Sequence, residues 1–390
     1  MGTTQNTQTV MDTTQVAQVP AQPLSTKLKR RDSRDEAWDE ARAKNTRRIL
    51  ENPHTLEDTV AFEASVGNKP RFTRELLERA VAHAVRANSS AYESRNVIIP
   101  HLLGGGEWKP PCIWGSDDGW RLDVRFVPTF ELTKEKGRKP LYTLMSQRGF
   151  LIENILRPDD IDTNPVRKTM AEEAPSAALV SEMVAMQQRI EASQAMEKIK
   201  TLLSVSPVQI DNIVCLALGN LCKPNARIEY MRGEHILACA IADCLAEHND
   251  SASTIPILAF DPEYDVEACR LLAHLPHPIH VVSSPYEYLS ITPNTLVICL
   301  GIPLYVPAYE IMADLLFPSG PAALMCIELQ HKPWHAKGLN SQWDPLVPRV
   351  AKMLEHYEVD WLGDVVPKVQ DGGLEELQWL RIVNWYSRKD

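Results

Sequence analysis

Short apolar runs alternate with helix-like segments through the second half of the chain. The apolar runs lie at residues 213–219, 256–262, 279–282, 295–301 and 322–328. Because apolar and polar residues do not alternate strictly within them, the runs are typical of strands buried on both faces, as in parallel sheets covered by helices. Right-handed crossovers between such strands give a doubly wound sheet. We therefore predict an α/β fold with a mostly parallel, Rossmann-like sheet.

The segments between these runs have the patterns of crossover helices. Residues 233–245 are apolar almost all round, as a helix sandwiched between parallel strands should be. Residues 265–275 and 304–317 continue the alternation of strand and helix.

The rest of the chain is expected to form an extension before this domain and a tail after it. Residues 1–30 are rich in Thr, Gln, Val and Pro without helical periodicity, so we expect a disordered N-terminus. Residues 31–205 form a charged, helical extension with a β-hairpin at 121–145, in which 121–127 pairs with 140–145. Residues 206–330 hold the Rossmann-type domain, and the aromatic-rich segment 331–390 packs on it.

Two amphipathic helices are predicted in the extension. The first covers residues 72–85, with Thr73 as its N-terminal cap. The second runs from about residue 176 to residue 203, where Leu179, Met183, Met186 and Ile190 share one face. A methionine stripe at this spacing is more typical of core packing than of a cofactor site.

The residues that follow the apolar runs are the candidates for function, because ligands of parallel sheets bind beyond the carboxyl ends of the strands. We expect ligand-binding residues at Gly219, Asn220, Asp261, Pro262, Ser283, Gly301, Pro303 and Tyr305. No catalytic residue is assigned, since a nucleophile, a base and an orienting group cannot be assembled from the sequence. The cofactor, if there is one, is unknown.

Two of these candidates have both a functional and a structural interpretation. A single glycine, Gly219, stands where a dinucleotide fingerprint has three, which argues against pyrophosphate binding. It suits a loop that passes close to an adenosine-sized ligand, and equally a tight turn. Asp261 stands where many nucleotide folds bind the ribose hydroxyls, but Asp-Pro is also a common start of a turn. The sequence leaves both alternatives open.

Composition narrows the class of partner and the compartment. The net charge of −10 argues against a general nucleic-acid binder, which needs a basic surface. No apolar run approaches the roughly 20 residues that cross a bilayer, so we expect no membrane span. The eight cysteines include no Cys-x-x-Cys pair and lie mostly inside predicted strands or helices, which favours reduced thiols and a cytoplasmic location.

Two charged or titratable motifs are ambiguous. The basic residues at 27–31 are either a nuclear-import patch, which would add a nuclear location, or the solvated start of a charged helix. His274, His277 and His280 recur at intervals of three, but Pro276 and Pro278 interrupt any helix through them. We therefore assign no metal site.

The ordered motifs between residues 215 and 328 resemble the Sensitivity-to-Red-light-Reduced (SRR-like) domain family, in a fungal-type architecture. The matching segments are LALGNL at 216–221, EHILACAIADCL at 234–245, DPEYDVEACRLL at 261–272, HVVSS at 280–284 and TLVICLGIPLY at 295–305. Their most specific part is the order and spacing of Gly219, Asp261-Pro262, Glu267 and Leu304-Tyr305. The resemblance covers about a third of the chain.

This resemblance implies a regulatory protein. Members of the family are linked to light and circadian signalling, to control of haem biosynthesis and to cytoskeletal phenotypes, in cytoplasm and nucleus, without an agreed catalytic activity. The chain departs from the family at Ala217, which replaces the first glycine of the turn, and at 300–302, which replace Pro-His-Cys. Residues 283–289 replace the family's Asn-Glu-Glu-Gly-Lys. If those groups carry chemistry in relatives, this chain has lost it.

Three hypotheses for the function follow. The first is a non-catalytic regulatory or signalling protein of the SRR-like family, whose domain binds a small ligand or a protein partner. The alternative is an S-adenosylmethionine-dependent methyltransferase or a related nucleotide-using enzyme, with Gly219 and Asn220 beside the methionine and Asp261 on the ribose. The third is a structural interaction module that uses the Trp-rich tail as its contact surface.

Overall fold

The computed structural model describes residue 64 and residues 70–89, 99–100, 107–108, 120–126, 150–156, 175–249, 254–301, 306–327, 329 and 348–389. All of these belong to one compact unit, residues 52–390. The candidate residues Pro303 and Tyr305, the aromatic residues Trp334 and Trp343 and the basic residues at 27–31 lie outside the described part of the chain.

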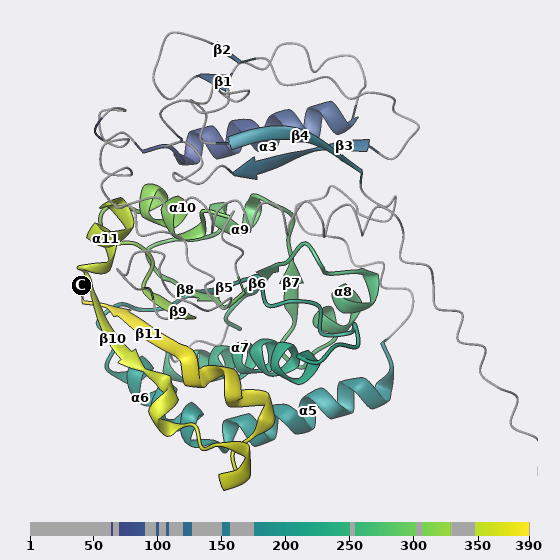
Figure 1. Ribbon diagram of the computed structural model, residues 1–390, viewed down its shortest axis with the longest axis vertical. Coiled ribbons are helices and arrows are strands. Elements are labelled where there is room, and N and C mark those ends of the chain that lie inside the picture. The colour runs from purple at the N-terminus through teal and green to yellow at the C-terminus, as the bar shows by residue number, and fades with distance from the viewer. Residues whose placement is uncertain are drawn as a thin grey trace, which may run out of the picture. The chain divides into compact units, whose positions relative to one another are not determined.

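A seven-stranded mixed sheet forms the centre of the fold (Figure 1). Its strand order is β10-β11-β9-β8-β5-β6-β7. The strands are β5 (Asn212–Leu216), β6 (Ile257–Phe260), β7 (Ile279–Val281), β8 (Thr295–Cys299), β9 (Ala323–Ile327), β10 (Tyr357–Trp361) and β11 (Val383–Arg388). The five strands from β5 to β9 pair in parallel, whereas β11 is antiparallel to both β9 and β10. The prediction of an α/β fold with a mostly parallel sheet is confirmed.

The chain order reverses in the middle of this sheet. From β5 the chain moves through β6 to β7 on one side, and then returns to place β8 and β9 on the other side. The segments that leave the carboxyl ends of β5 and β8 therefore belong to the two halves of the sheet.

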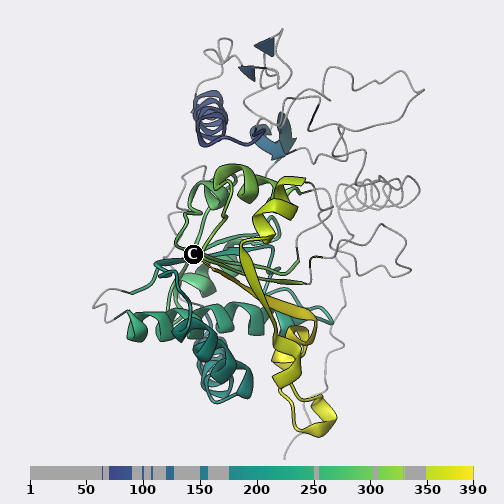
Figure 2. The same cartoon turned by 90° about the vertical axis from the view of Figure 1, so that its left-hand side faces the viewer.

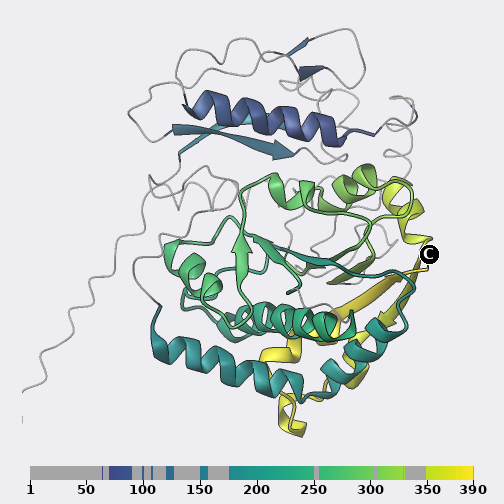
Figure 3. The same cartoon turned by 180° about the vertical axis from the view of Figure 1, so that it is seen from behind.

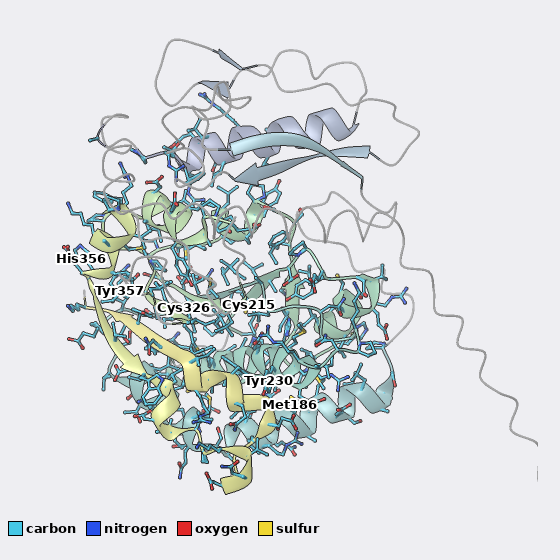
Figure 4. All side chains as sticks on the ribbon, viewed as in Figure 1. Met186, Cys215, Tyr230, Cys326, His356 and Tyr357 are labelled. Atoms are coloured by element: carbon cyan, nitrogen blue, oxygen red, sulfur yellow. The ribbon has the colours of Figure 1, made fainter. Side chains whose placement is uncertain are left out.

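Alternate residues of each strand enter two separate hydrophobic clusters, one on each face of the sheet. On β5, Ile213 and Cys215 face one cluster, and Val214 and Leu216 face the other. Strands β5, β8 and β9 are buried on both sides, which explains their continuous apolar runs, whereas β7 exposes His280. In Figure 4, Cys215 and Cys326 lie inside the molecule, between helices on either side.

Helices cover both faces (Figures 1 and 3). Helix α7 (Ile228–His248) lies against one face, with α5 (Ala177–Glu191) and α6 (Gln194–Ser204) packed outside it and α8 (Val266–Ala273) beside it. The other face is covered by α9 (Tyr286–Leu289), α10 (Ala308–Leu315) and α11 (Pro348–Leu354). The helices predicted between the apolar runs are thus present.

The helix predicted at 176–203 is instead two helices. Helix α5 ends at Glu191, and Ser193 begins α6 by accepting a hydrogen bond from the Met196 amide at 3.2 Å. A serine hydroxyl at this position satisfies a first-turn amide and favours a new helix start. The predicted methionine stripe is core, because Met183 and Met186 are buried against α7.

The predicted helix at 72–85 is α3 (Arg74–Ser89), and the Leu76 amide donates to the Thr73 hydroxyl at 3.3 Å, so the predicted cap is present. Just before it, the amides of Arg71 and Phe72 donate to the Asp314 carboxylate of α10 at 2.7 and 3.1 Å. The Arg71 guanidinium pairs with Glu310 of the same helix, and Phe72 is fully buried. This part of the extension therefore belongs to the core.

One strand of the predicted hairpin is present. Strand β3 (Trp120–Phe126) is present where residues 121–127 were expected, and it pairs antiparallel with β4 (Phe150–Leu156). Residues 140–145 lie outside the described part of the chain. A further short antiparallel pair joins β1 (Ile99–Pro100) and β2 (Glu107–Trp108). Residues 140–145 and 150–156 are both largely apolar, so the sequence pattern alone did not indicate 150–156 as a partner of β3.

The aromatic tail contributes two strands to the sheet. Strands β10 and β11 are joined by the 3-10 helices η2 (Leu362–Val365), η3 (Val369–Asp371) and η4 (Glu375–Ile382). Trp379, Trp385 and Tyr386 are buried, so these rings belong to the core, whereas Trp361 on β10 is 53% exposed. The tail extends the sheet beyond β9 and leaves β10 at its end.

Candidate functional site

The segments after β5 and β6 meet, as the sequence predicted. The two strands are parallel, with Leu216 opposite Phe260, and the Ala217 amide donates to the Phe260 carbonyl at 3.0 Å. One turn further, the Gly219 amide donates to the Asp261 carboxylate at 2.7 Å. Two of the candidate residues are therefore in direct contact.

The Asp261 side chain serves both loops. Its Oδ2 accepts the Gly219 amide, and its Oδ1 accepts the Glu263 amide at 2.7 Å. Asp261 is buried, with 6% of its surface exposed. A ribose diol would have to share carboxylate oxygens that already accept two partly buried backbone amides, and such amides are costly to leave without a partner. This geometry favours the structural interpretation of Asp261.

Asn220 joins the same two loops from the other side. Its amide nitrogen donates to the Glu263 carbonyl at 2.8 Å, and its side-chain oxygen accepts the amides of Cys222 and Lys223 at 2.9 and 3.2 Å. Only 1% of its surface is exposed. The polar groups of Gly219, Asn220 and Asp261 are thus bonded to protein and not directed at an open space.

The backbone here adopts a conformation that favours glycine. Gly219 has φ +78°, and a Cβ on it would lie 2.8 Å from the Met231 side chain of α7. Ala217 has φ +56° although it carries a Cβ, a conformation that costs roughly 1–2 kcal/mol for an L-residue. A glycine would adopt the left-handed backbone at 217 at a lower cost than this alanine does.

Gly301 lies where the order of the strands reverses. A Cβ on Gly301 would collide with the carbonyl oxygen of Ala217, so the segments leaving β8 and β5 touch through their backbones. The other predicted residues lie apart from this contact. Pro262 is exposed, and Ser283 is buried after β7, where its carbonyl accepts the Tyr286 amide at 2.9 Å.

Sequence analysis missed a buried carboxyl group on α7. Glu234 is 3% exposed, and among the described residues its carboxyl accepts no hydrogen bond. Burial raises the pKa of Glu234 to about 8, the charge of Asp261 adds to this, and Arg227 opposes it. The signal was present, because this glutamate stands in a helix that is otherwise apolar almost all round.

His235 is its neighbour and is held neutral. Burial lowers the pKa of His235 to about 4, although its hydrogen bond to the Met231 carbonyl opposes that change. In the neutral ring, Nδ1 donates to Met231 at 2.6 Å, so Nε2 accepts the Tyr264 hydroxyl at 2.7 Å. Burial also raises the pKa of Tyr264, which keeps it a donor. Both ring nitrogens are occupied, which leaves neither for a substrate.

The thiols of the central strands are not activated. Cys215, Cys299 and Cys326 are buried, and burial raises the pKa of Cys326 to about 12 and that of Cys215 further. A nucleophilic cysteine needs the opposite shift. His277, from the histidine cluster, has both ring nitrogens on protein oxygens, at 2.8 Å from Asp243 and 2.7 Å from the Ile255 carbonyl.

No protein-family model, no curated protein and no solved structure matches this chain. Within the described helices, none combines the length and the apolar content needed to cross a bilayer. The same part of the chain contains no group of three or more His, Cys, Asp or Glu residues placed to hold a metal ion.

Proposed function

We propose that this chain is a non-catalytic regulatory protein of the SRR-like family, whose doubly wound, Rossmann-like domain binds a small ligand or a protein partner. The observation that carries the proposal is the mutual bonding of Gly219, Asn220 and Asp261. Groups that an enzyme of this fold would direct at a substrate hold two loops together instead. The resemblance to the family supports the regulatory role.

The acid–base groups near the strand ends support the non-catalytic part. General acid–base catalysis needs a group that can reach the substrate and exchange a proton. His235 has both nitrogens bonded to protein, and Glu234 and Tyr264 are buried in their neutral forms near neutral pH. The thiols of the strands are buried as well. On the loop after β7, Ser284 donates to the buried Glu287 carboxylate at 2.8 Å, so this hydroxyl has a base in reach. The turnover measurement below tests whether the pair acts on a substrate.

The reversal of strand order supports binding near β5 and β8. In open α/β sheets, ligands bind where the strand order reverses, because the loops on either side diverge there. Ala217 and Gly301 mark this point, and their backbones are in contact. The proposed ligand or partner therefore approaches over the segments that follow Leu216 and Cys299.

A ligand panel with two readouts tests the proposal. Purified full-length protein is exposed separately to nucleotides, S-adenosylmethionine and haem, and the unfolding midpoint is compared with that of the protein alone. Mass spectrometry then follows each compound over hours. We expect a stabilising shift for a binder and no consumption of it. Turnover of any compound would overturn the non-catalytic part.

The alternative, an S-adenosylmethionine-dependent methyltransferase, is favoured by one observation: the acid after β6 lies beside the loop after β5. In that enzyme Asp261→Ala would abolish binding of S-adenosylmethionine and leave the fold intact. If Asp261 is structural, the same change lowers stability. Calorimetric titration of wild type and variant, each checked by circular dichroism, separates the two.

We further propose a cytoplasmic location, extended to the nucleus by the basic residues at 27–31, and no general binding to nucleic acid, in line with the net charge of −10. Replacing Lys29, Arg30 and Arg31 by alanine in a fluorescent fusion tests the nuclear part. An unchanged ratio of nuclear to cytoplasmic signal would contradict it.

A further inference from the structure

Strand β10 forms one end of the seven-stranded sheet, and β11 is its neighbour on one side only (Figures 1 and 2). In Figure 4, His356 and Tyr357 mark the start of this strand at the outer edge of the sheet. The opposite end of the sheet is the short strand β7. The edge of β10 is the longer of the two, with five residues against three.

The register shows which backbone groups of β10 face outward. Tyr357 lies opposite Arg388, so His356 lies opposite Lys389, and the Lys389 amide donates to the His356 carbonyl at 2.9 Å. In an antiparallel pair, hydrogen-bonded positions alternate with positions that face away. Glu358 therefore bonds to β11, and Val359 directs its amide and carbonyl away from β11.

These outward groups lack partners in the described part of the chain. No hydrogen bond among the described residues reaches the backbone of Val359. Two positions on, the Trp361 carbonyl accepts the Lys198 ammonium at 2.7 Å, a side-chain contact that ends the open stretch. The edge thus offers an amide and a carbonyl in strand geometry.

The side chains along this edge divide by chemistry. Val359 and Trp361 lie on one face, opposite Tyr386 and Asn384 of β11, and are 54% and 53% exposed. Ile382, two residues before Asn384, is 57% exposed. The other face carries Glu358, exposed, and Asp360, half-buried. One face is therefore apolar and the other acidic.

Edge strands of natural proteins are commonly protected by lysine, proline or a bulge. Strand β10 reads Tyr-Glu-Val-Asp-Trp and has neither lysine nor proline. Pairing with the same strand of a second copy, antiparallel about Val359, would place Glu358 against the Asp360 of the other copy. Like charges directly opposite destabilise a sheet. The charge pattern disfavours self-pairing and favours a basic strand.

We propose that the outer edge of β10 docks an extended segment of a partner protein in which lysine or arginine alternates with apolar residues. The segment adds a strand to the sheet, its apolar side chains cover Val359 and Trp361, and its basic side chains meet Glu358 and Asp360. This inference does not rest on the proposed function, because an open edge docks a strand whether or not the strand ends bind a ligand.

The test uses full-length protein and a short fluorescent peptide of alternating lysine and valine. Two control peptides keep its length: one carries glutamate for lysine, and one carries N-methylated amides that cannot form a ladder. Fluorescence anisotropy measures the affinity. We expect the basic peptide to bind and both controls to bind at least about tenfold more weakly, because each lacks charge complementarity or main-chain bonds.

Three variants locate the contact. Val359→Pro removes the outward amide at an edge position that tolerates proline, and the double variant Glu358→Lys with Asp360→Lys reverses the charge. Glu78→Lys with Glu247→Lys makes the same change at exposed positions on α3 and α7. The first two should lower peptide affinity about tenfold or more, and the third should not. Circular dichroism confirms that each variant is folded.

Equal affinity for the basic and acidic peptides would overturn the proposal, as would unchanged affinity in Val359→Pro. Sedimentation of the protein alone tests whether a second copy of the chain pairs with the edge instead. If the protein self-associates and Val359→Pro abolishes that, a second copy occupies the edge and the proposal is wrong.

Discussion

Two regions of the molecule differ in where their polar groups bond. One is the pair of strand ends around Gly219 and Asp261, and the other is the outer edge of β10. At the strand ends, partly buried amides and side-chain oxygens bond to one another across two loops. At β10, the Val359 backbone faces away from its sheet, beside side chains more than half exposed. The first region is built to hold the molecule together. The second region has a backbone amide and a carbonyl, at Val359, that a partner strand can bind through main-chain hydrogen bonds.

The largest expected effect concerns Glu234. Its pKa is raised from 4.5 to about 8 in the folded protein, so the stability it contributes is fully present below pH 4.5 and is lost as the pH rises through 8. The shift corresponds to about 5 kcal/mol of unfolding free energy. Glu234→Gln should remove this loss. Urea unfolding of both proteins between pH 4.5 and 9 measures it, and identical pH profiles would contradict the prediction.

The second largest effect is expected for Asp261→Ala, which should lower the unfolding free energy by about 4 kcal/mol. The substitution leaves the amides of Gly219 and Glu263 without their acceptor in a partly buried setting, and each costs roughly 1–3 kcal/mol. Asp261→Asn is the matched control, because its one side-chain oxygen still accepts an amide, and it should cost about half as much. Denaturant unfolding at constant pH measures both. A stable Asp261→Ala variant that has lost a ligand would reverse the structural interpretation.

His235 produces the opposite dependence on pH. Its pKa is lowered from 6.5 to about 4, so its contribution is present above pH 6.5 and is lost as the pH falls through 4. The shift corresponds to about 3 kcal/mol. His235→Gln cannot titrate, so unfolding free energies measured from pH 7 to pH 4 should fall less steeply. His280→Gln, at an exposed histidine, should leave the wild-type slope unchanged.

The smallest effect on stability is expected at the edge. Val359→Thr keeps the branched shape of an exposed side chain, so the unfolding free energy should change by less than about 0.5 kcal/mol. The same change should weaken binding of the lysine–valine peptide, since it removes an apolar contact. A large loss of stability would mean that Val359 belongs to the core, and the contrast between the two regions would fail.

Sequence patterns predicted the centre of the fold because burial on two faces leaves a strong signal. Most runs from β5 to β9 are apolar almost throughout, with the exposed His280 of β7 as an exception, so strand, direction and crossover followed. Strand β10 was missed, although Tyr357, Val359 and Trp361 alternate with acidic residues as in a half-exposed strand. The partner of β3 and the helix break at Ser193 depend on which contacts form in space. Local pattern does not fix those contacts.

The contact between Gly219 and Asp261 follows from the topology, whereas the predicted role of these residues in ligand binding stays a prediction. Topology alone places Gly219 beside Asp261, because the carboxyl ends of neighbouring parallel strands share an edge. Whether that carboxylate faces a ligand or an amide depends on ångström-scale loop geometry, to which Ala217 and Gly301 contribute through backbone contact. Glu234 could have been predicted as a perturbed carboxyl group, since an acid inside an apolar helix is either paired or protonated.

The bond from the Gly219 amide to Asp261 makes that single proton a gauge of loop movement. While the two loops stay joined, the amide is shielded from solvent and exchanges its hydrogen for deuterium slowly. A bound molecule that separates the two loops will expose the Gly219 amide, and hydrogen exchange will become faster at that residue first. A molecule that binds to the closed loops will slow the exchange of the Gly219 amide hydrogen further.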